Sequence, residues 1–534
     1  MKGGTNMENF DYDLQSIQEA RNLARLGKIA TEKLVNYTEE QIDKILQNMV
    51  RVAEENAVML AKMAVEETGF GKVEDKTFKN HMASTIVYNY IKDMKCAGII
   101  SEDPVNKVME VADPVGLIMG IVPSTNPTST AIYKSMIAIK ARNAIVFSPH
   151  PSALQCTLKA ATLMRDAAVA AGAPENVIGC LSMPSMGATD ELMKCKETSL
   201  IIATGGPGMV KAAYSAGKPA LGVGAGNSPS YIERTADVAQ SVKDILASKT
   251  FDNGTVCESE QSVICEECNR DQVIAEFKKQ GGYFMTAEET AKVCNLLFKN
   301  GGHSMSAKFV GRSAQVIAAA AGISIPDGTR VLIGEQQGVG DGYPLSYEKL
   351  TTVLAFYTVR DWHEACELSI KLLQNGIGHT MNIHTNDPQI VREFSRKPAS
   401  RILVNTGGTQ GGTGASTALA PAFTLGCGTW GGSATSENVT PMNLVNIKRV
   451  VYGLKDVSTL AQTDPTFHPD FGCCHGSNAA GAQPASAQPV SPLQYSLGCN
   501  CTTGNQGVAA AEGIDGKQLL ELVNELVNAM KSGT

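Results

Sequence analysis

The stretch "VGLIMGIVPSTNPTSTAIYKSMIAIKARNAIVFSPHPSA" (residues 115–153) places a helical pattern between two short, continuous apolar runs. Apolar runs of this length, separated by helices, are typical of parallel strands buried on both faces of a doubly wound sheet. The same alternation returns at residues 198–217, "TSLIIATGGPGMVKAAYSAG". The sequence therefore predicts an α/β fold built on a doubly wound parallel sheet.

The predicted strands also indicate where a ligand would bind. In open α/β sheets the ligand lies beyond the carboxyl ends of the strands, here Pro123–Pro127, Ser148–His150 and Thr204–Gly208. The last of these loops, "TGGPG", follows a strand and precedes a helix, so its amide groups suit a pyrophosphate. It lacks the GxGxxG spacing, and a tight turn without a ligand is the alternative interpretation.

Segments on both sides extend this pattern. Residues 11–66 carry apolar residues at helical spacing, and Thr38 with Gln41 predicts a capping box for a helix that ends at Gly69. Residues 230–434 repeat the alternation of strand and helix with different loops, which predicts a second α/β unit.

The C-terminal part of the chain changes composition. Residues 472–510 are rich in Gly, Ala, Ser, Pro and Gln, which predicts a flexible linker. Residues 511–534 then place leucines, valines and a methionine on one face of an amphipathic helix. A single helix of this length is marginal in water, so its apolar face needs a partner. The helix either folds back on its own core or, as the long tether favours, docks on another protein.

Bulk composition excludes several classes of function. The chain has 534 residues, 43% hydrophobic and 19% charged, as in ordinary globular proteins. A net charge of −7 argues against a nucleic-acid partner. No apolar run approaches the roughly 20 residues that span a bilayer, and no secretory signal is recognisable. We therefore expect a cytoplasmic protein, without a membrane partner, whose cysteines stay reduced.

One of those cysteines, Cys257, follows an Asn-Gly turn in "SKTFDNGTVCESEQSV" (residues 248–263). An unpaired cysteine most often only packs as a small apolar residue. A reactive role would need help, because a thiol with a pKa of about 8.5 is mostly protonated at neutral pH. Glu258 would disfavour the thiolate if its side chain pointed the same way.

Six motifs decide between packing and catalysis for Cys257. Together they resemble the aldehyde dehydrogenase superfamily, and within it the coenzyme A-acylating branch, most closely the propionaldehyde and acetaldehyde dehydrogenases of propanediol and ethanolamine breakdown. The resemblance covers about residues 20–456. The motifs are "VPSTNPTST" (122–130), "IATGGPG" (202–208), "GVGAGNSP" (222–229), "FDNGTVCESEQ" (251–261), "YPLSYEKLTTVL" (343–354) and "GIGHTMNIHTND" (376–387).

The resemblance implies an aldehyde dehydrogenase-like α/β fold with three parts. These are a Rossmann-type cofactor domain, an α/β catalytic domain that holds the cysteine, and a small β element for oligomerisation. A homodimer or homotetramer is implied. The corresponding ranges are 1–97 and 115–229 for the cofactor domain, 230–434 for the catalytic domain, and 98–114 with 435–456 for the oligomerisation strands.

Catalytic roles are carried over from the matching motifs. Cys257 corresponds to the nucleophile that forms a thioester with the aldehyde carbon. Asn126 and the Cys257 backbone N–H correspond to the donors that stabilise the oxyanion. Asn126 could otherwise be only a turn residue before proline. His379 matches the histidine that deprotonates coenzyme A, with His384 on the same strand as its nearest rival.

The resemblance also implies a nicotinamide cofactor, NAD with NADP as the alternative, and coenzyme A as co-substrate. Glu348 matches a ribose-binding glutamate, although a solvated surface charge is the other reading. Ser148 stands where hydrolytic members carry a lysine, which leaves the adenosine contact open. The expected cofactor contacts are Pro123, Ser124, Thr125, Ser148, Pro149, His150, Thr204, Gly205, Gly206, Gly224 and Glu348.

The product of the reaction follows from a missing residue. Hydrolytic members place a glutamate base where this sequence has Gly222, Val223 and Gly224. Without that base the thioester should persist until coenzyme A arrives, so propanal or acetaldehyde would become an acyl-CoA. The alternatives are a hydrolytic NAD(P)-dependent aldehyde dehydrogenase and a catalytically silent shell-binding protein.

The segment 511–534 resembles the encapsulation peptides that dock enzymes on bacterial microcompartment shells. A shell protein is therefore the expected partner, and the cytoplasmic microcompartment the expected location. No metal site is expected. Cysteines and a histidine near the linker lack paired CxxC spacing, which favours a flexible tail; they are Cys473, Cys474, His475, Cys499 and Cys501.

Overall fold

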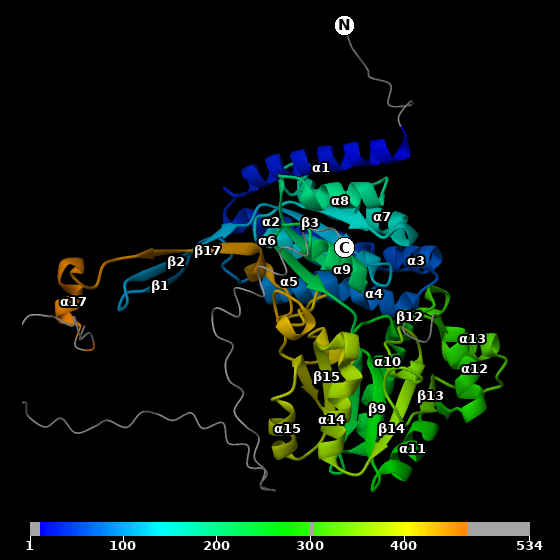
Figure 1. The fold of residues 1–534 in the computed structure, drawn as a ribbon. Helices are drawn as coiled ribbons and strands as arrows, with labels where there is room; N and C mark the ends of the chain where they lie inside the picture. The colour runs from blue at the N-terminus through cyan, green and yellow to red at the C-terminus, as the bar shows by residue number, and fades with distance from the viewer. Residues whose placement is uncertain (1–10, 300–303, 465, 467–534) are drawn as a thin grey trace, which may run out of the picture. The chain divides into compact units, whose positions relative to one another are not determined.

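The computed structural model describes residues 11–299, 304–464 and 466 (Figure 1). The described residues up to Asp456 belong to one compact unit, and Val457 begins a second one. Among these residues, no helix combines the length and apolar character needed to cross a bilayer. The predicted linker and the predicted terminal helix, 472–510 and 511–534, lie outside the described residues.

The chain opens with helices, as predicted. They are α1 (Tyr12–Leu34), α2 (Glu39–Glu55), α3 (Ala57–Thr68), α4 (Val73–His81), the π-helical η2 (Met82–Ile86) and α5 (Val87–Ile91).

Local signals set most of the boundaries of these helices. The predicted capping box is present, because Thr38 Oγ1 accepts from Gln41 N and the Gln41 side chain accepts from Thr38 N. Gly69 ends α3 at a φ of 69°. The prediction of one helix from Thr38 to Gly69 is wrong, because Asn56 interrupts it at φ −109° and ψ 4°. There the Asn56 side chain donates to the Val52 carbonyl, and an asparagine that bonds nearby backbone favours a break.

A five-stranded parallel sheet follows, in the order β5-β4-β3-β6-β7, and it confirms the predicted doubly wound fold. The strand order reverses between β3 and β6, so the loops after these two strands leave toward opposite faces and open a crevice. The strands are β3 (Leu117–Val122), β4 (Ile145–Pro149), β5 (Ile178–Cys180), β6 (Thr198–Thr204) and β7 (Ala220–Val223). The helices between and around them are α6 (Pro127–Lys140), α7 (Leu154–Ala170), α8 (Met186–Lys194) and α9 (Pro207–Tyr214).

A second parallel sheet has seven strands in the order β10-β13-β14-β9-β8-β15-β16. Buried apolar side chains form a cluster on each side of it, as expected for a sheet covered by helices on both faces. The strands are β8 (Ser228–Ile232), β9 (Glu260–Glu266), β10 (Gly282–Phe284), β13 (Val331–Glu335), β14 (Val353–Val359), β15 (Gly378–His384) and β16 (Ala399–Val404). Its helices are α10 (Val238–Thr250), α11 (Arg270–Lys279), α12 (Ala287–Leu297), α13 (Ala314–Ala321), α14 (Trp362–Leu373), α15 (Pro388–Phe394) and α16 (Gly408–Gly412).

Three antiparallel strands form a separate sheet that Figure 1 shows extending away from the two parallel sheets. They are β1 (Gly98–Asp103), β2 (Val108–Pro114) and β17 (Val445–Val451). An ion pair of 2.8 Å between Arg449 and Glu110 links β17 to β2. Within the predicted strand range 435–456, only β17 is a strand, and η10 (Pro441–Leu444) leads into it.

Candidate active site

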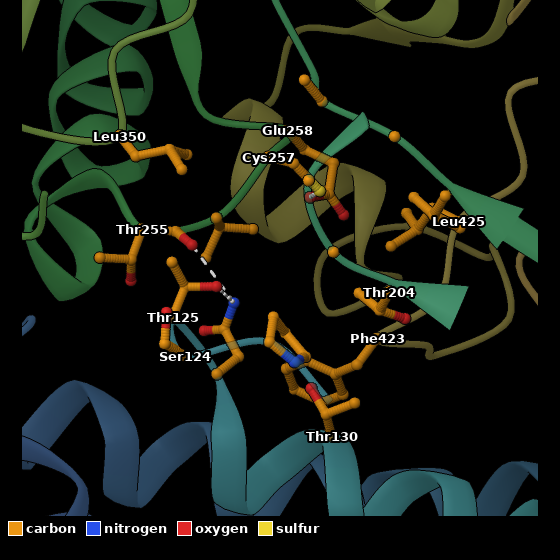
Figure 2. A pocket seen from close by; sticks show the side chains of 18 of the residues that line it. Ser124, Thr125, Thr130, Thr204, Thr255, Cys257, Glu258, Leu350, Phe423 and Leu425 are labelled. Atoms are coloured by element: carbon orange, nitrogen blue, oxygen red, sulfur yellow. Dashed lines mark hydrogen bonds between the residues drawn. The ribbon is translucent and has the colours of Figure 1, made fainter. Parts of the chain in front are cut away.

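A cavity of about 260 Å³ lies at the carboxyl ends of β3 and β6, where the loops of the first sheet meet the segment that carries Cys257 (Figure 2). Most of the predicted site residues line it. They are Pro123, Ser124, Thr125, Asn126, His150, Thr204, Gly205, Gly206, Gly224, Cys257 and Glu348.

Three predicted residues do not line this cavity. Ser148 and Pro149 are buried in β4, and Ser148 Oγ shares a 2.9 Å hydrogen bond with Thr189 Oγ1. His379 is also buried, yet it lies beside Cys257. Residues outside the predicted site set complete the wall, namely Thr130, Pro207, Val223, Ala225, Thr255, Val256, Glu258, Leu350, Thr413, Phe423 and Leu425.

The backbone before Cys257 is a tight turn. Asp252, Asn253 and Gly254 have φ values of 48°, 53° and 77°, a left-handed run that the short polar side chains and glycine tolerate. On the other side, a Cβ built at Gly226 would lie 2.0 Å from the Cys257 carbonyl oxygen, so only glycine allows this approach. The position of Cys257 is therefore set by close backbone packing on both sides.

The Cys257 thiol points toward Glu258. Its Sγ donates a hydrogen bond of 2.9 Å to Glu258 Oε2, and Oε1 has no partner among the described residues. Burial raises the pKa of Cys257 well above its usual value, and the neighbouring Glu258 charge raises it further. Burial also raises the pKa of Glu258. The resting side chain is thus a protonated thiol with a proton acceptor already in contact.

His379 completes this group at the start of β15. Its Nδ1 shares a 2.9 Å hydrogen bond with Thr380 Oγ1, and its buried Nε2 lacks a partner in the described part of the chain. One ligand atom each from Cys257, Glu258 and His379 lies within 4.8 Å of the others, a set that could also hold a metal ion. Burial, and then Arg401, keep the pKa of His379 far below its usual value, so the imidazole is neutral in the resting protein.

His384, the rival candidate, lies at the opposite end of β15. Its main chain pairs with Ile232 of β8, and burial lowers its pKa to about 4. The five-residue separation in the strand sends the two histidine side chains to opposite faces of the sheet. Of the two, His379 is therefore the one beside the thiol.

Asn126 precedes α6 and faces the same cavity. Its Nδ2 donates to Thr125 Oγ1 and to the Thr255 carbonyl, both at 3.2 Å. Its Oδ1 accepts a 2.6 Å hydrogen bond from Lys79. Thr125 and Thr255, the two acceptors of the amide N–H₂ group, line the same cavity as Cys257.

The loop after β6 and the N-terminus of α9 form the other end of the cavity. A Cβ built at Gly206 or Gly224 would meet no atom within 4 Å, so both glycines border open space. Glu348 Oε1 accepts from Gly226 N at 2.8 Å, and burial raises the pKa of Glu348 to about 7. Glycines that border open space beside a helix N-terminus leave room for the phosphates of a dinucleotide.

Comparison with known proteins places this geometry in a family. Residues 11–286 match the aldehyde dehydrogenase family. The chain belongs to this family. It is 40% identical over 439 residues to succinate-semialdehyde dehydrogenase (acetylating) from Clostridium kluyveri, covering 82% of this chain and 96% of that protein. It is 47% identical over 442 residues to the bifunctional aldehyde-alcohol dehydrogenase AdhE of Escherichia coli K12, where the chain spans about half of the relative, 49%.

Solved structures of aldehyde dehydrogenases share the fold. An acetylating aldehyde dehydrogenase from Geobacillus thermoglucosidasius has 54% identity and a TM-score of 0.82, over 84% of this chain and 99% of that one. A propionaldehyde dehydrogenase from Rhodopseudomonas palustris, solved with bound CoA and an acylated cysteine, has 26% identity and a TM-score of 0.74, over 81% and 97%.

Proposed function

We propose that this chain is a coenzyme A-dependent acylating aldehyde dehydrogenase that oxidises a short aldehyde, propanal or acetaldehyde, to its acyl-CoA. The observation that carries the proposal is the grouping of Cys257, Glu258 and His379 within 4.8 Å beside a cavity that Asn126 also lines. A nucleophile, proton acceptors and an amide donor are the groups that such a reaction needs.

In the first half-reaction, Cys257 Sγ bonds to the aldehyde carbon and its proton passes to Glu258 Oε2, which already accepts it. The carbonyl oxygen becomes an oxyanion that Asn126 Nδ2 and the Cys257 N–H would stabilise. A nicotinamide cofactor, when bound, would supply the acceptor for the hydride of that carbon. Cys257 is left holding the acyl group as a thioester.

In the second half-reaction, His379 Nε2 takes the proton of the coenzyme A thiol. The coenzyme A sulfur then bonds to the acyl carbon, and the bond from that carbon to Cys257 Sγ breaks. Cys257 leaves as a thiolate and takes back the proton that Glu258 accepted, and His379 releases its proton to solvent. The step needs a neutral imidazole, which burial provides, and the same burial opposes the imidazolium that forms, so His379 is a weak base in the resting site.

The hydrolytic alternative needs a base for water. Gly222, Val223 and Gly224 carry no carboxylate, as noted from the sequence, but Glu258 stands 2.9 Å from the sulfur. The absence of a glutamate at 222–224 therefore does not by itself decide against hydrolysis. Acyl transfer is favoured by the acetylating relatives, two of which align over nearly their whole length.

The test is to follow NADH formation from propanal with and without coenzyme A, and to identify the product. Acyl-CoA with a strict coenzyme A requirement supports the proposal. Full-rate formation of propionate without added thiol contradicts it. Repeating the assay with NADP decides the cofactor, and a series of aldehydes of increasing length decides the substrate.

Assembly and location are part of the same proposal. The sheet of β1, β2 and β17 exposes apolar side chains, including Ile447, Val450 and Val451, and we expect it to join subunits in a dimer or tetramer. Residues 511–534 would dock the enzyme on a microcompartment shell in the cytoplasm. Comparing co-sedimentation of the full chain and a 512–534 deletion with purified shell protein tests this docking.

A further inference from the structure

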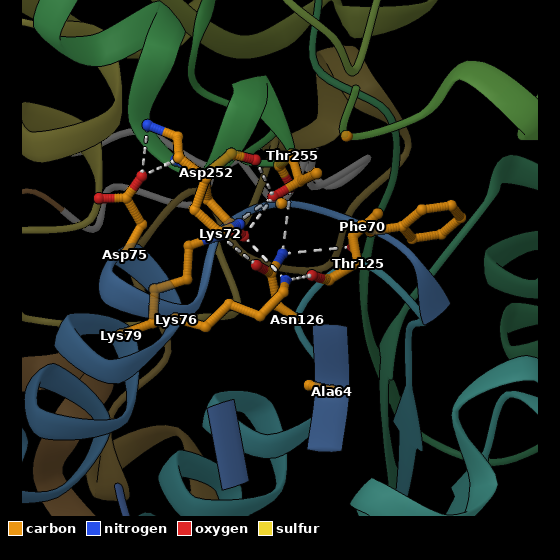
Figure 3. A network of polar contacts seen from close by, with 12 residues as sticks. Ala64, Phe70, Lys72, Asp75, Lys76, Lys79, Thr125, Asn126, Asp252 and Thr255 are labelled. Atoms are coloured by element: carbon orange, nitrogen blue, oxygen red, sulfur yellow. Dashed lines mark hydrogen bonds and ion pairs between the residues drawn. The ribbon is translucent and has the colours of Figure 1, made fainter. Parts of the chain in front are cut away.

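We propose that Lys79 is a positioning residue that fixes the orientation of the Asn126 amide, and that Asp252 holds Lys79 in place for this purpose. The inference rests on the proposed function, because it concerns the oxyanion donor of that reaction. Lys79 belongs to α4, Asn126 precedes α6, and Asp252 lies in the turn before Cys257 (Figure 3).

The contacts of Lys79 connect these three elements. Its Nζ donates to Asn126 Oδ1 at 2.6 Å, to Asp252 Oδ2 at 2.5 Å and to Thr255 Oγ1 at 3.1 Å. An ammonium group has three donors and no acceptor, so these partners use all three of its protons. Lys79 therefore has no capacity left for another ligand.

This chemistry determines which way the amide faces. Because an ammonium only donates, it requires the oxygen of Asn126 and repels the N–H₂ group. Nδ2 is consequently turned toward Thr125 Oγ1 and the Thr255 carbonyl, at 3.2 Å each. Both bonds are long for N–H···O contacts, so an oxyanion can replace one of them at little cost. With the amide flipped, its oxygen would face the developing negative charge.

Asp252 is held as tightly as Lys79. Its N–H donates to Asp75 Oδ2 at 2.7 Å, and its Oδ1 accepts from Lys72 N at 2.8 Å. A Cβ built at Gly71 would lie 1.8 Å from Asp252 Oδ1, so the backbone of residue 71 closes directly over the carboxylate. The turn before Cys257 and the helix that carries Lys79 are thus locked together.

The cluster of Lys76, Lys79 and Asp252 carries more positive than negative charge. Lys76 also donates to Asp252 Oδ2, at 2.8 Å, and both lysines are 2% exposed while Asp252 is fully buried. Two buried ammonium groups on one carboxylate are costly, and such groups usually destabilise relative to apolar packing. A positioning role for Lys79 accounts for retaining this arrangement beside the reacting atoms.

The arrangement also offers a matched control. Lys76 lies on the same helix, is equally buried and binds the same Asp252 oxygen, but its other bond goes to the Thr125 carbonyl and not to Asn126. Lys76→Met and Lys79→Met therefore remove the same charge at the same depth. Only the second change releases the Asn126 amide.

Acylation of Cys257 by p-nitrophenyl acetate is a suitable readout, because the burst of nitrophenolate needs the thiol and the oxyanion donors but neither nicotinamide cofactor nor coenzyme A. We expect Asn126→Ala to slow the burst about 100-fold, as for other oxyanion donors. Lys79→Met should slow it at least about tenfold, and Lys76→Met less than about threefold. Thermal unfolding should report a similar loss of stability for both lysine variants.

The double variant separates positioning from a structural role. If Lys79 acts through Asn126, Lys79→Met should cost less than about threefold when added to Asn126→Ala. Multiplicative losses in the double variant, or equal burst rates for the two lysine variants, overturn the proposal. An Asn126→Ala variant with an unchanged burst would contradict the oxyanion role of Asn126 instead, which is a failure of the proposed function and not of the Lys79 contact alone.

Discussion

The Cys257 thiol donates a 2.9 Å hydrogen bond to Oε2 of Glu258, its neighbour in the chain. This contact makes the nucleophile a poor thiolate in the resting protein, because burial and the Glu258 charge both raise the pKa of Cys257. The same contact lets Glu258 accept the thiol proton when Cys257 attacks an aldehyde. The same carboxylate thus suppresses the free thiolate and accepts its proton during addition.

Glu258→Gln should make Cys257 more reactive toward an alkylating reagent. The substitution removes the adjacent negative charge and supplies an amide donor for the thiolate, so the pKa of Cys257 should fall. We expect the pH midpoint of alkylation by iodoacetamide to move to lower pH, with labelling located at Cys257 by mass spectrometry. An unchanged or higher midpoint would show that the Glu258 charge does not control the thiol.

Cys257→Ala should abolish aldehyde oxidation, with a loss of at least about a thousandfold in NADH formation. Cys268→Ala is the control, since Cys268 is an exposed free cysteine outside the cavity and its removal should leave the rate unchanged. Unchanged NADH formation in the Cys257 variant would contradict the role of Cys257 as nucleophile, and absence of NADH formation in the unmodified chain would support the catalytically silent alternative.

His379→Ala should separate the two half-reactions. Acylation of Cys257 should continue, while transfer to coenzyme A should slow about 100-fold or more because the thiol has lost its base. Rapid-mixing measurement of the NADH burst and of the following steady rate distinguishes these steps. His384→Gln, on the same strand but away from the thiol, should keep both rates. Loss of the burst in the His379 variant would instead place His379 in the first step.

The rate of Cys257 acylation at alkaline pH should depend on Lys79. Burial lowers the pKa of Lys79 to about 8, while Asp252 and Asp75 oppose the shift and Lys76 adds to it. The Lys79 charge in turn acts to lower the pKa of Glu258, so the two groups interact electrostatically. A neutral amine can accept a hydrogen bond and no longer dictates the amide orientation, so acylation should fall as pH rises through about 8. The arginine in a Lys79→Arg variant stays charged, so its acylation rate should not decline in this pH range. A decline of the acylation rate that persists in the Lys79→Arg variant would arise from the titration of another side chain.

Glu260→Gln should stabilise the protein selectively at higher pH. Glu260 is fully buried, and burial raises its pKa to about 7 from 4.5. Between these values the unfolded chain releases a proton that the folded chain retains, so stability declines as pH rises. We expect the variant to gain about 1–3 kcal/mol at pH 8 relative to pH 5 in chemical denaturation. Gln retains the oxygen that accepts from Gly408 N, so an equal effect at both pH values would point to lost packing instead.

Local patterns in the chain predicted much of the fold and the loops that carry the candidate site residues. Apolar runs and capping residues predicted the first sheet and the opening helices, and the motifs around Asn126 and Cys257 predicted which loops meet at the cavity. The break at Asn56 was missed because a single side-chain bond to the backbone outweighed a continuous helical pattern.

Sequence by itself thus determined the layered α/β fold, since burial periodicity and capping act over a few residues. Tertiary structure alone decided which way Glu258 points, that His379 and not His384 lies beside the thiol, and that Lys79 meets Asn126 and Asp252. Lys79 and Asp252 are 173 positions apart, and Lys79 and Asn126 are 47 apart. Contacts over such separations depend on how helices pack on sheets, and no local pattern encodes the direction in which a buried charged side chain finds its partner.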